Sequence, residues 1–284
     1  MIEEFLVLGL IQGFIYALLA MGFSLVYGVG GVLNLSHGGF YLLTAYVFFW
    51  NYTSLGVVNT IIISLIMITI IGGLAYLFLI KPLEHTPIGV VIGTFALAFF
   101  IEQFVQFAGD AKIHSDIPPL IEGSIEFLGF EIDAHLLLII IVSLTVIVSL
   151  TIFINKSKLG KSIRAVSQDR EAATLMGINA DRILLYTVMI SAFLAGIAAI
   201  LYIPKDIVAP HKGWSILINS FAVVVLGGMG SLLGSVAGSF IIAFVGSYCN
   251  FYIDPSVSYL VPIIIIVVML VFRPQGLFGK KELL

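Results

Sequence analysis

Long stretches without charge dominate the chain. No Asp, Glu, Lys or Arg occurs in the 76 residues from Phe5 to Ile80 or in the 41 residues from Gly213 to Ile253. A helix that crosses a bilayer needs only about 20 apolar residues, so each stretch is predicted to cross a membrane more than once. Both stretches are continuously apolar rather than alternating apolar and polar, which favours helices over the strands of a membrane barrel.

Breaks in the apolar pattern divide the chain into nine predicted membrane segments. They cover residues 5–27, 33–50, 57–80, 88–108, 134–154, 183–203, 214–230, 232–253 and 256–272. Segment 214–230 has only 13 residues before the break Gly227-Gly228-Met229-Gly230, which is about 20 Å of helix and too short for the hydrocarbon core. We therefore predict an all-α, polytopic transmembrane helical bundle of about eight to ten membrane segments, some broken or re-entrant. It forms a single domain over residues 1–284.

Two glycine pairs have the spacing that lets helices approach closely in lipid. They are Gly9-x-x-x-Gly13 and Gly234-x-x-x-Gly238. Close helix packing is the interpretation we favour for both pairs.

Composition agrees with a membrane protein and narrows its class. Hydrophobic residues make up 60% of the chain and charged residues 10%, and the mean hydropathy is +1.16, far above what a soluble domain needs for its core. A net charge of −3 argues against a nucleic-acid surface, which would show as a basic field. The start, MIEEFLVLGL, lacks a basic region and a small-residue cleavage site, so we expect a retained first span. Cys249 is the only cysteine, so no internal disulfide can form.

The distribution of basic residues predicts an orientation. Ten of the thirteen lie in segment 156–182, in the tail after residue 272 or at Lys81, and basic residues favour the cytoplasmic side. The loop 109–133 is acidic instead and suits the outer face. Nine crossings then place the amino terminus outside and the carboxyl terminus in the cytoplasm.

One dense polar segment, residues 156–182, stands in the middle of the apolar pattern. Its Gly160-Lys161-Ser162 run matches the end of a nucleotide-binding P-loop, but that motif requires glycine at position 155, where the chain has Asn155. We therefore expect this chain not to hydrolyse ATP by itself.

The same segment predicts a short amphipathic helix, DREAATLMG. The carboxylates of Asp169 and Glu171 interact favourably with the positive, amino-terminal end of the helix dipole. Ala172 and Ala173 are small helix formers, and Gly177 can adopt the left-handed conformation that stops a helix. Leu175 and Met176 supply an apolar face on which a partner could be buried. A solvated loop without any partner is the alternative.

Several motifs together resemble the permease subunits of branched-chain amino acid ABC importers. They are Glu171-Ala172-Ala173-x-x-x-Gly177, Tyr27-Gly28 leading to Asn34-Leu35-Ser36-His37-Gly38, Gly160 with Arg164-Ala165, Gly177-Ile178-Asn179 with Arg182, Leu226-Gly227-Gly228-Met229-Gly230-Ser231, and Arg273-Pro274-x-Gly276-Leu277-Phe278-Gly279. The resemblance covers nearly the whole length, and it is closer to the shorter of the two membrane subunits in such systems.

The resemblance implies the role of segment 156–182 and the partners of the chain. In that family, residues 171–177 would form a coupling helix that docks on a cytoplasmic ATPase. The implied partners are a second related permease, two ATPase subunits that carry ATP and Mg²⁺, a periplasmic or lipid-anchored binding protein, and membrane lipid, with no nucleic acid. No cofactor or metal is expected on this chain, and no catalytic constellation appears, since the histidines are scattered without metal-ligand spacing.

Candidates for lining a transport pathway lie at two helix breaks. They are Asn34, Ser36, His37, Gly38, Gly227, Gly228, Gly230 and Ser231. Buried polar groups in a membrane are costly, so they either line a pathway or satisfy backbone groups freed by the break, and both interpretations stay open here. Glu102 lies inside a predicted span, where we expect an outer-rim position rather than an ion relay.

Three other functions compete with branched-chain amino acid import. The resemblance also extends to permeases for urea, short amides or other amino acids. A self-sufficient secondary transporter would need ion-coordinating acids in mid-membrane, and Glu102 is the only carboxylate inside a predicted span. A membrane scaffold is the third, and the combined motifs argue against it.

Overall fold

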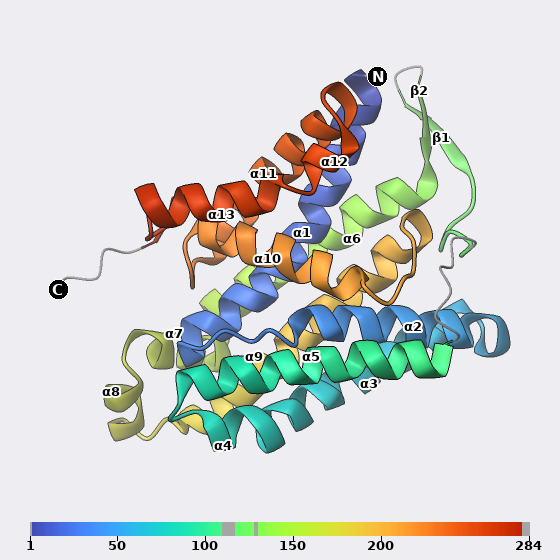
Figure 1. Ribbon diagram of the computed structural model, residues 1–284. Coiled ribbons are helices and arrows are strands. Elements are labelled where there is room, and N and C mark those ends of the chain that lie inside the picture. The colour runs from blue at the N-terminus through green and yellow to red at the C-terminus, as the bar shows by residue number, and fades with distance from the viewer. Residues whose placement is uncertain (1, 110–116, 128–129, 280–284) are drawn as a thin grey trace.

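A computed structural model describes residues 2–109, 117–127 and 130–279 as a helical bundle (Figure 1). Its helices are α1 (Ile2–Gly30), α2 (His37–Leu55), α3 (Val57–Ala75), α4 (Lys81–Leu83), α5 (Pro87–Gly109), α6 (Ala134–Lys156), α7 (Lys158–Gln168), α8 (Arg170–Leu175), α9 (Ala180–Tyr202), α10 (Lys212–Gly227), α11 (Leu232–Tyr252), α12 (Pro255–Ser258) and α13 (Val261–Phe272). A π-helical turn, η1 (Tyr76–Ile80), joins α3 to α4, and a 3-10 turn, η2 (Ile203–Lys205), follows α9.

The predicted polytopic helical bundle is confirmed. Within the described ranges, seven helical stretches are long and apolar enough to span a membrane. α2 and α10 complete the nine predicted segments, and α10 is indeed short, with 16 residues or about 24 Å of helix.

Two breaks bring non-helical backbone into the bundle. Residues 31–36 run from the end of α1 back into the bundle before α2 begins (Figure 1). His37, the first residue of α2, is fully buried. Before α10, the stretch 206–211 does the same, and Val208 within it is buried. Irregular backbone at membrane depth is tolerated only where protein or a water-filled cavity surrounds it, and each break is buried over part of its length.

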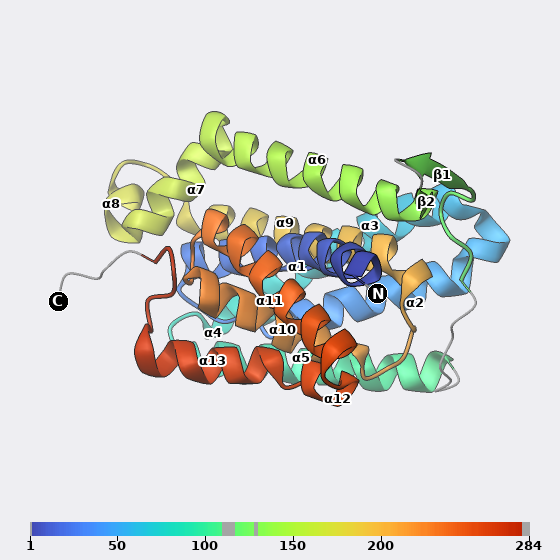
Figure 2. The same cartoon turned by 90° about the horizontal axis from the view of Figure 1, so that it is seen from above.

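The two ends of the bundle carry different structures. α7 and α8 lie at one end together with the carboxyl-terminal end of the described chain, and the strands lie at the opposite end (Figures 1 and 2). Six of the described helices begin with a capping side chain that accepts a backbone N–H, which satisfies one of the donors left free in a first helical turn. These caps are Asp133, Ser157, Asp169, Asn179, Ser231 and Asp254.

The expected all-α class missed one feature. Strands β1 (Ser124–Phe127) and β2 (Phe130–Asp133) form an antiparallel hairpin in the acidic loop between α5 and α6. Strand pairing lets the two segments satisfy each other's backbone groups. The acidic residues Asp110 and Asp116 of the same loop lie outside the described residues.

α9 is the most enclosed of the long helices, and its small residues explain why. It packs against α1, α2 and α3. A run of alanines keeps its surface low enough for three neighbours to approach: Ala192, Ala195, Ala198 and Ala199 are all fully buried.

Close packing is also the role of the two glycine pairs. α1 and α11 lie side by side, and a Cβ on Gly9 or Gly13 would come within 2.6 Å of the Phe244 ring or 2.4 Å of the Phe240 ring, respectively. The aromatic rings of α11 therefore lie directly on the bare backbone of α1. Gly234, at the start of α11, faces the end of α10 in the same way, because a Cβ there would lie 2.1 Å from the Gly227 carbonyl oxygen.

We predict that Gly234→Ala destabilises the protein by about 1–3 kcal/mol, the usual cost of overpacking a well-packed site. The added methyl group meets backbone atoms of Gly227, which cannot rotate away as a side chain could. A lower midpoint of thermal unfolding for the protein in lipid nanodiscs would report the change.

Gly246→Ala is the matched control in the same helix. A Cβ at Gly246 meets nothing closer than the Ser258 hydroxyl at 3.7 Å, so this variant should be neutral or slightly more stable because alanine favours helix. Equal melting of both variants and the parent protein would contradict the packing role of Gly234.

Candidate functional site

The predicted short helix around residue 172 is present as α8. The Asp169 side chain caps it by accepting a hydrogen bond from the Ala172 N–H at 2.9 Å. At its other end Gly177 has φ +86°, a conformation that side chains with a Cβ rarely adopt, and Ile178 N–H closes the turn on the Ala173 carbonyl at 3.0 Å. The local sequence therefore starts and stops this helix as expected.

α8 presents its largest apolar side chains to the outside. Leu175 is 88% exposed and Met176 is 84% exposed, whereas Ala173 on the opposite side is buried. Glu171, Ala172 and Gly177 are exposed as well. A short helix with an uncovered apolar tip and small residues beside it suits contact with another protein.

Arg170 holds α8 against two other elements. Its guanidinium donates to Glu84, which follows α4, at 3.1 Å and to Asp181, in the first turn of α9, at 2.9 Å. Lys81 of α4 also pairs with Asp181 at 3.2 Å. Partial burial disfavours the Arg170 cation, but hydrogen bonds to the two carboxylates and their charge outweigh it, so the pKa of Arg170 lies above its ordinary value.

α7 connects α8 rigidly to the bundle. Ile163 and Val166 on its inner face are buried, and the helix packs against α1, α6 and α9. Gly160 lies in α7 where a Cβ would come within 2.4 Å of the carbonyl oxygens of Phe153 and Ile154 at the end of α6. This glycine is thus part of a tight helix corner, in agreement with the exclusion of a P-loop.

The pathway candidates at the first break bond to each other and to neighbouring helices. The Asn34 side-chain oxygen accepts from the Ser36 N–H at 3.1 Å and from the Ser36 hydroxyl at 2.5 Å. Nδ1 of His37 lies 3.1 Å from the Ser191 hydroxyl of α9. A Cβ on Gly38 would lie 2.3 Å from the Gly213 carbonyl oxygen, so α2 and α10 touch through their backbones there. Asn34 thus satisfies backbone freed by the break, and a pathway role for these four residues stays a prediction.

The candidates at the second break lie where the tail of the chain meets α10. The N–H groups of Leu277 and Phe278 donate to the carbonyls of Leu226 and Gly227 at 2.8 and 3.0 Å. Gly228, with φ +104°, leaves room for this tail, because a Cβ on it would lie 2.5 Å from the Gly279 nitrogen.

Two neighbours of Gly228 have local roles at the same break. Gly230, with φ +85°, lies against Gly28 of α1, and Ser231 caps α11. Pathway lining by these residues and by Gly227 and Gly228 also stays a prediction.

Glu102 is buried against neighbouring helices, and the expected outer-rim position stays a prediction. It is 4% exposed, and its carboxylate accepts from the Trp214 indole N–H and lies 2.5 Å from Nδ1 of His211. Because the break before α10 brings His211 and Trp214 to α5, the buried carboxylate finds an exposed histidine and a partly buried tryptophan as partners. In the sequence His211 lies in a linker and Trp214 begins the predicted segment 214–230, and nothing in their spacing links them to Glu102.

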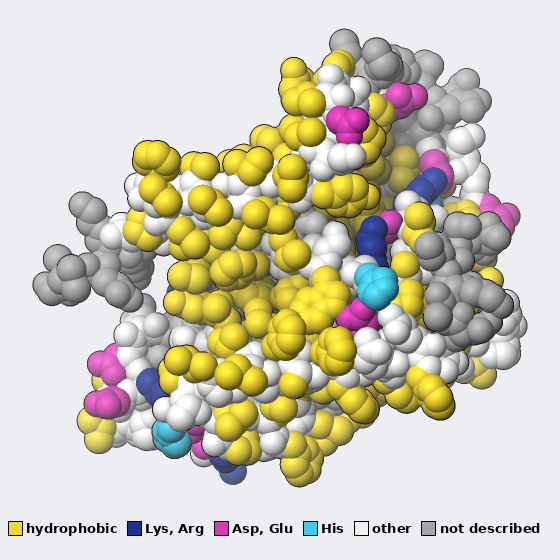
Figure 3. Space-filling view, viewed as in Figure 1, with side chains coloured by type: hydrophobic (Ala, Val, Ile, Leu, Met, Phe, Trp, Pro, Cys, Tyr) yellow, Lys and Arg dark blue, Asp and Glu magenta, His cyan; other side chains and the backbone are white. Residues whose placement is uncertain are grey.

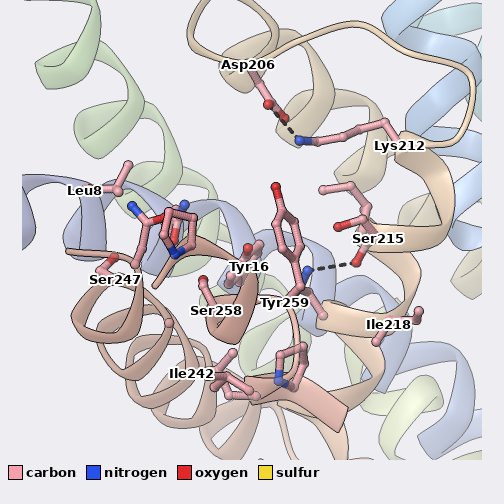
Figure 4. Close-up of a pocket in the computed structure, with 18 of the residues that line it drawn as sticks. Leu8, Tyr16, Asp206, Lys212, Ser215, Ile218, Ile242, Ser247, Ser258 and Tyr259 are labelled. Atoms are coloured by element: carbon pink, nitrogen blue, oxygen red, sulfur yellow. Dashed lines mark hydrogen bonds and ion pairs between the residues drawn. The ribbon is translucent and has the colours of Figure 1, made fainter. Parts of the chain in front are cut away.

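A cavity among the described residues was also missed. It has a volume of about 430 Å³ and lies between α1, α10, α11 and the start of α13. Asp206 and Lys212 line it and pair with each other at 2.7 Å (Figure 4). Asp206 lies in the linker before α10 and Lys212 is the first residue of α10, a region where charged side chains in sequence look like an ordinary solvated loop.

One face of the molecule is largely apolar, with a polar centre and charged groups toward its edges. Figure 3 shows hydrophobic side chains over most of this face, a histidine with basic and acidic neighbours near its middle, and further charged side chains at the lower left and the top. The side chain of His211 is 76% exposed, next to the buried Glu102. A polar group in the middle of an otherwise lipid-compatible surface indicates that lipid does not cover it.

Comparison with known sequences decides the family. Residues 5–270 match the family described as branched-chain amino acid transport system, permease component. The chain belongs to this family. It is therefore a multi-pass membrane transport subunit, as its motifs and its apolar helices predicted.

Individual relatives cover almost the full length. The chain is 30% identical to the high-affinity branched-chain amino acid transport system permease protein BraD of Pseudomonas aeruginosa, over 98% of this chain and 95% of BraD. It is 27% identical to the permease protein LivH of Escherichia coli, over 96% of this chain and 94% of LivH. It is 25% identical to LivM of the same organism, over 93% of this chain but 67% of LivM.

One solved structure shares the fold. PsaBC from Streptococcus pneumoniae in complex with Fab matches with a TM-score of 0.56 at 14% identity, over 98% of each chain. At this identity the match supports the helical architecture alone.

We predict that Arg170→Gln loosens α8 without unfolding the bundle. Partly exposed ion pairs are worth up to about 1 kcal/mol, so local opening of residues 171–176 should increase roughly fivefold while the thermal midpoint changes little. Hydrogen exchange of this segment, followed by mass spectrometry, measures the opening.

Arg164→Gln is the control. Arg164 bonds to Asn155 at the α6–α7 corner and not to α4 or α9, so its loss should leave exchange in α8 unchanged. The anchoring role of Arg170 is wrong if both variants exchange alike.

Proposed function

We propose that this chain is the permease subunit of an ATP-driven importer and forms part of the pathway for branched-chain amino acids. The observation that carries the proposal is the family match over residues 5–270. Relatives named as branched-chain amino acid permeases, at up to 30% identity over nearly the full length, support the substrate class.

The motor of this importer lies on separate ATPase subunits in the cytoplasm. Within its described residues, the structure offers α8 as the contact, because Leu175 and Met176 are uncovered while Arg170 ties the helix to α4 and α9. A force on α8 then reaches two membrane segments at once: α3, through α4 and η1, and α9, through Asp181 in its first turn. ATP and Mg²⁺ bind to the ATPases rather than to this chain.

The orientation follows from this role. α8 faces the cytoplasm, which puts the carboxyl-terminal end of the described chain on the same side and the start of α1 outside (Figure 1). The protein resides in the inner, or plasma, membrane. A binding protein, periplasmic or lipid-anchored, delivers the substrate at the end that carries the β-hairpin.

A second, related permease covers the apolar face with the polar centre. The chain described here is similar to LivM as well as to LivH, and this supports pairing between two permeases of this kind. Exposed His211 beside Glu102 would be costly against lipid, and at an interface it would face a protein surface or the water of the pathway.

The decisive experiment reconstitutes the complex. The chain, its second permease, the two ATPases and the binding protein are co-purified into liposomes, and uptake of labelled leucine, isoleucine, valine, alanine and urea is measured with and without ATP. We expect ATP-dependent uptake of the three branched amino acids. Uphill uptake by this chain without ATPases would instead identify a secondary transporter, and uptake of urea alone would identify a different substrate class.

We also predict that Leu175→Ser with Met176→Ser reduces capture of the ATPase by at least about tenfold. Two large side chains that are buried on docking contribute roughly 1.5–3 kcal/mol each to binding. Because both are exposed in the unbound chain, replacing them should leave the stability of the fold unchanged. Pull-down of the ATPase with the purified permease measures the effect.

Ile88→Ser is the matched control. Ile88 is 75% exposed near the start of α5, at the same end of the bundle but outside α8. It should leave capture unchanged, and equal recovery of ATPase with the double variant would remove α8 as the docking element.

A further inference from the structure

We infer that the cavity between α1, α10, α11 and α13 binds the zwitterionic backbone of an α-amino acid, with Asp206 and Lys212 as the recognising pair. This inference rests on the proposed transport of amino acids and adds the site. It assigns the ammonium group to Asp206, the carboxylate to Lys212 and the aliphatic side chain to the apolar wall.

The pair has binding capacity that its own ion pair leaves unused. Lys212 Nζ donates to Oδ1 of Asp206 at 2.7 Å, but Oδ2 of Asp206 is buried and has no partner among the described residues. A buried carboxylate oxygen without a partner is costly, and an ammonium group would satisfy it. The Lys212 ammonium has three N–H donors, and its side chain is 30% exposed. It can therefore donate to a ligand carboxylate while it keeps its ion pair with Asp206.

A net-neutral ligand is what the electrostatics of this cavity allow. Asp206 and Lys212 cancel each other, and the other residues that line the cavity carry no ionised group. A solute with one net charge would leave an uncompensated charge at membrane depth, whereas a zwitterion forms two ion pairs and adds none.

The remaining walls divide into a polar and an apolar part. Ser247 lines the cavity and is 1% exposed, and its buried hydroxyl has no partner among the described residues. Ile216, Ile242 and Val261 are buried apolar wall residues. Figure 4 shows the Asp206–Lys212 pair apart from Ile242 and Ser247, with Tyr259 and Tyr16 between them. An aliphatic side chain can therefore lie on the isoleucines while the charged groups meet the pair.

Size and depth agree with a ligand site. A volume of about 430 Å³ falls within the range of about 300–1,000 Å³ that is typical of small-molecule pockets. The lining runs along α1 from Leu8 to Tyr16, about 12 Å of helix, so the cavity reaches the middle of the membrane segment. Tyr259 is 74% exposed and marks the mouth, at the end of the bundle opposite α8.

The test is protection of a cysteine in the cavity. Ser258→Cys, in a Cys249→Ala background, is introduced into the assembled transporter in nanodiscs, and its rate of modification by a small thiosulfonate reagent is measured. Ser258 lines the cavity, whereas Ser256, two residues away, is exposed outside it and provides the control position Ser256→Cys.

Three ligands distinguish the contribution of the ammonium group from that of the carboxylate group. L-Leucine should slow modification of Ser258→Cys, while 4-methylpentanoate, which lacks the ammonium group, and 3-methylbutylamine, which lacks the carboxylate, should not. Ser256→Cys should react at one rate throughout. Because this series needs no change to Asp206 or Lys212, it stays decisive if variants of that pair fail to assemble.

A substitution then tests the pair. Asp206→Asn should raise the leucine concentration that gives half protection by at least about tenfold, as expected for the loss of a hydrogen bond to a charged group. Asp133→Asn is the matched control, since Asp133 also pairs with a lysine, Lys205, but does not line the cavity. Unchanged protection in Asp206→Asn would overturn the assignment.

The outcomes distinguish this site from the transport proposal. If leucine is taken up with ATP but neither it nor alanine or glutamate protects Ser258→Cys, the cavity assignment is wrong and the transport proposal stands. Protection by the singly charged analogues as well would also overturn it. If a zwitterion protects but no branched-chain amino acid is transported, the site stands and the proposed substrate falls.

Discussion

The structure depends on one constraint: backbone polar groups inside a membrane must find partners within the protein. Most segments meet it as continuous helices, but α2 and α10 begin only part of the way through the bundle. The irregular segments before them, residues 31–36 and 206–211, pack in part against other helices. In the first segment the Asn34 side chain accepts from the Ser36 N–H, and the Leu35 N–H donates to the Thr94 hydroxyl of α5 at 3.1 Å. The polar residues that the breaks introduce are thereby concentrated in the centre of the protein.

The same two breaks explain why the candidate sites lie where they do. The segment before α10 and the first residue of that helix place three polar side chains at the bundle. His211 contacts Glu102, and Asp206 and Lys212 line the cavity. At the far end, α7 and α8 are ordinary capped helices held by ion pairs and a glycine corner. Irregular backbone thus occurs near the proposed ligand, and rigid short helices occur near the proposed motor.

The sequence predicted the parts of this protein that depend on local chemistry. The apolar runs predicted the number of segments. Asp169 as a cap and Gly177 as a stop residue predicted α8, and the structure shows the cap and the positive φ. It could not predict contacts between residues far apart in the chain. The partners of Glu102 were not visible, because His211 and Trp214 lie more than a hundred residues later, just before and within α10. The hairpin β1–β2 was missed because two four-residue strands beside long helices give only a weak periodic pattern.

The contact between the tail and α10 has a consequence for the order of assembly. Leu277 and Phe278 cover the last carbonyls of α10, yet they follow α11, α12 and α13 in the chain. While the polypeptide emerges from the ribosome, α10 therefore enters the membrane with an open carboxyl end, and only residues synthesised long afterwards close it. Maturation of this half of the permease is a late event, and a polypeptide that stops before residue 277 would contain every helix and still be unfinished.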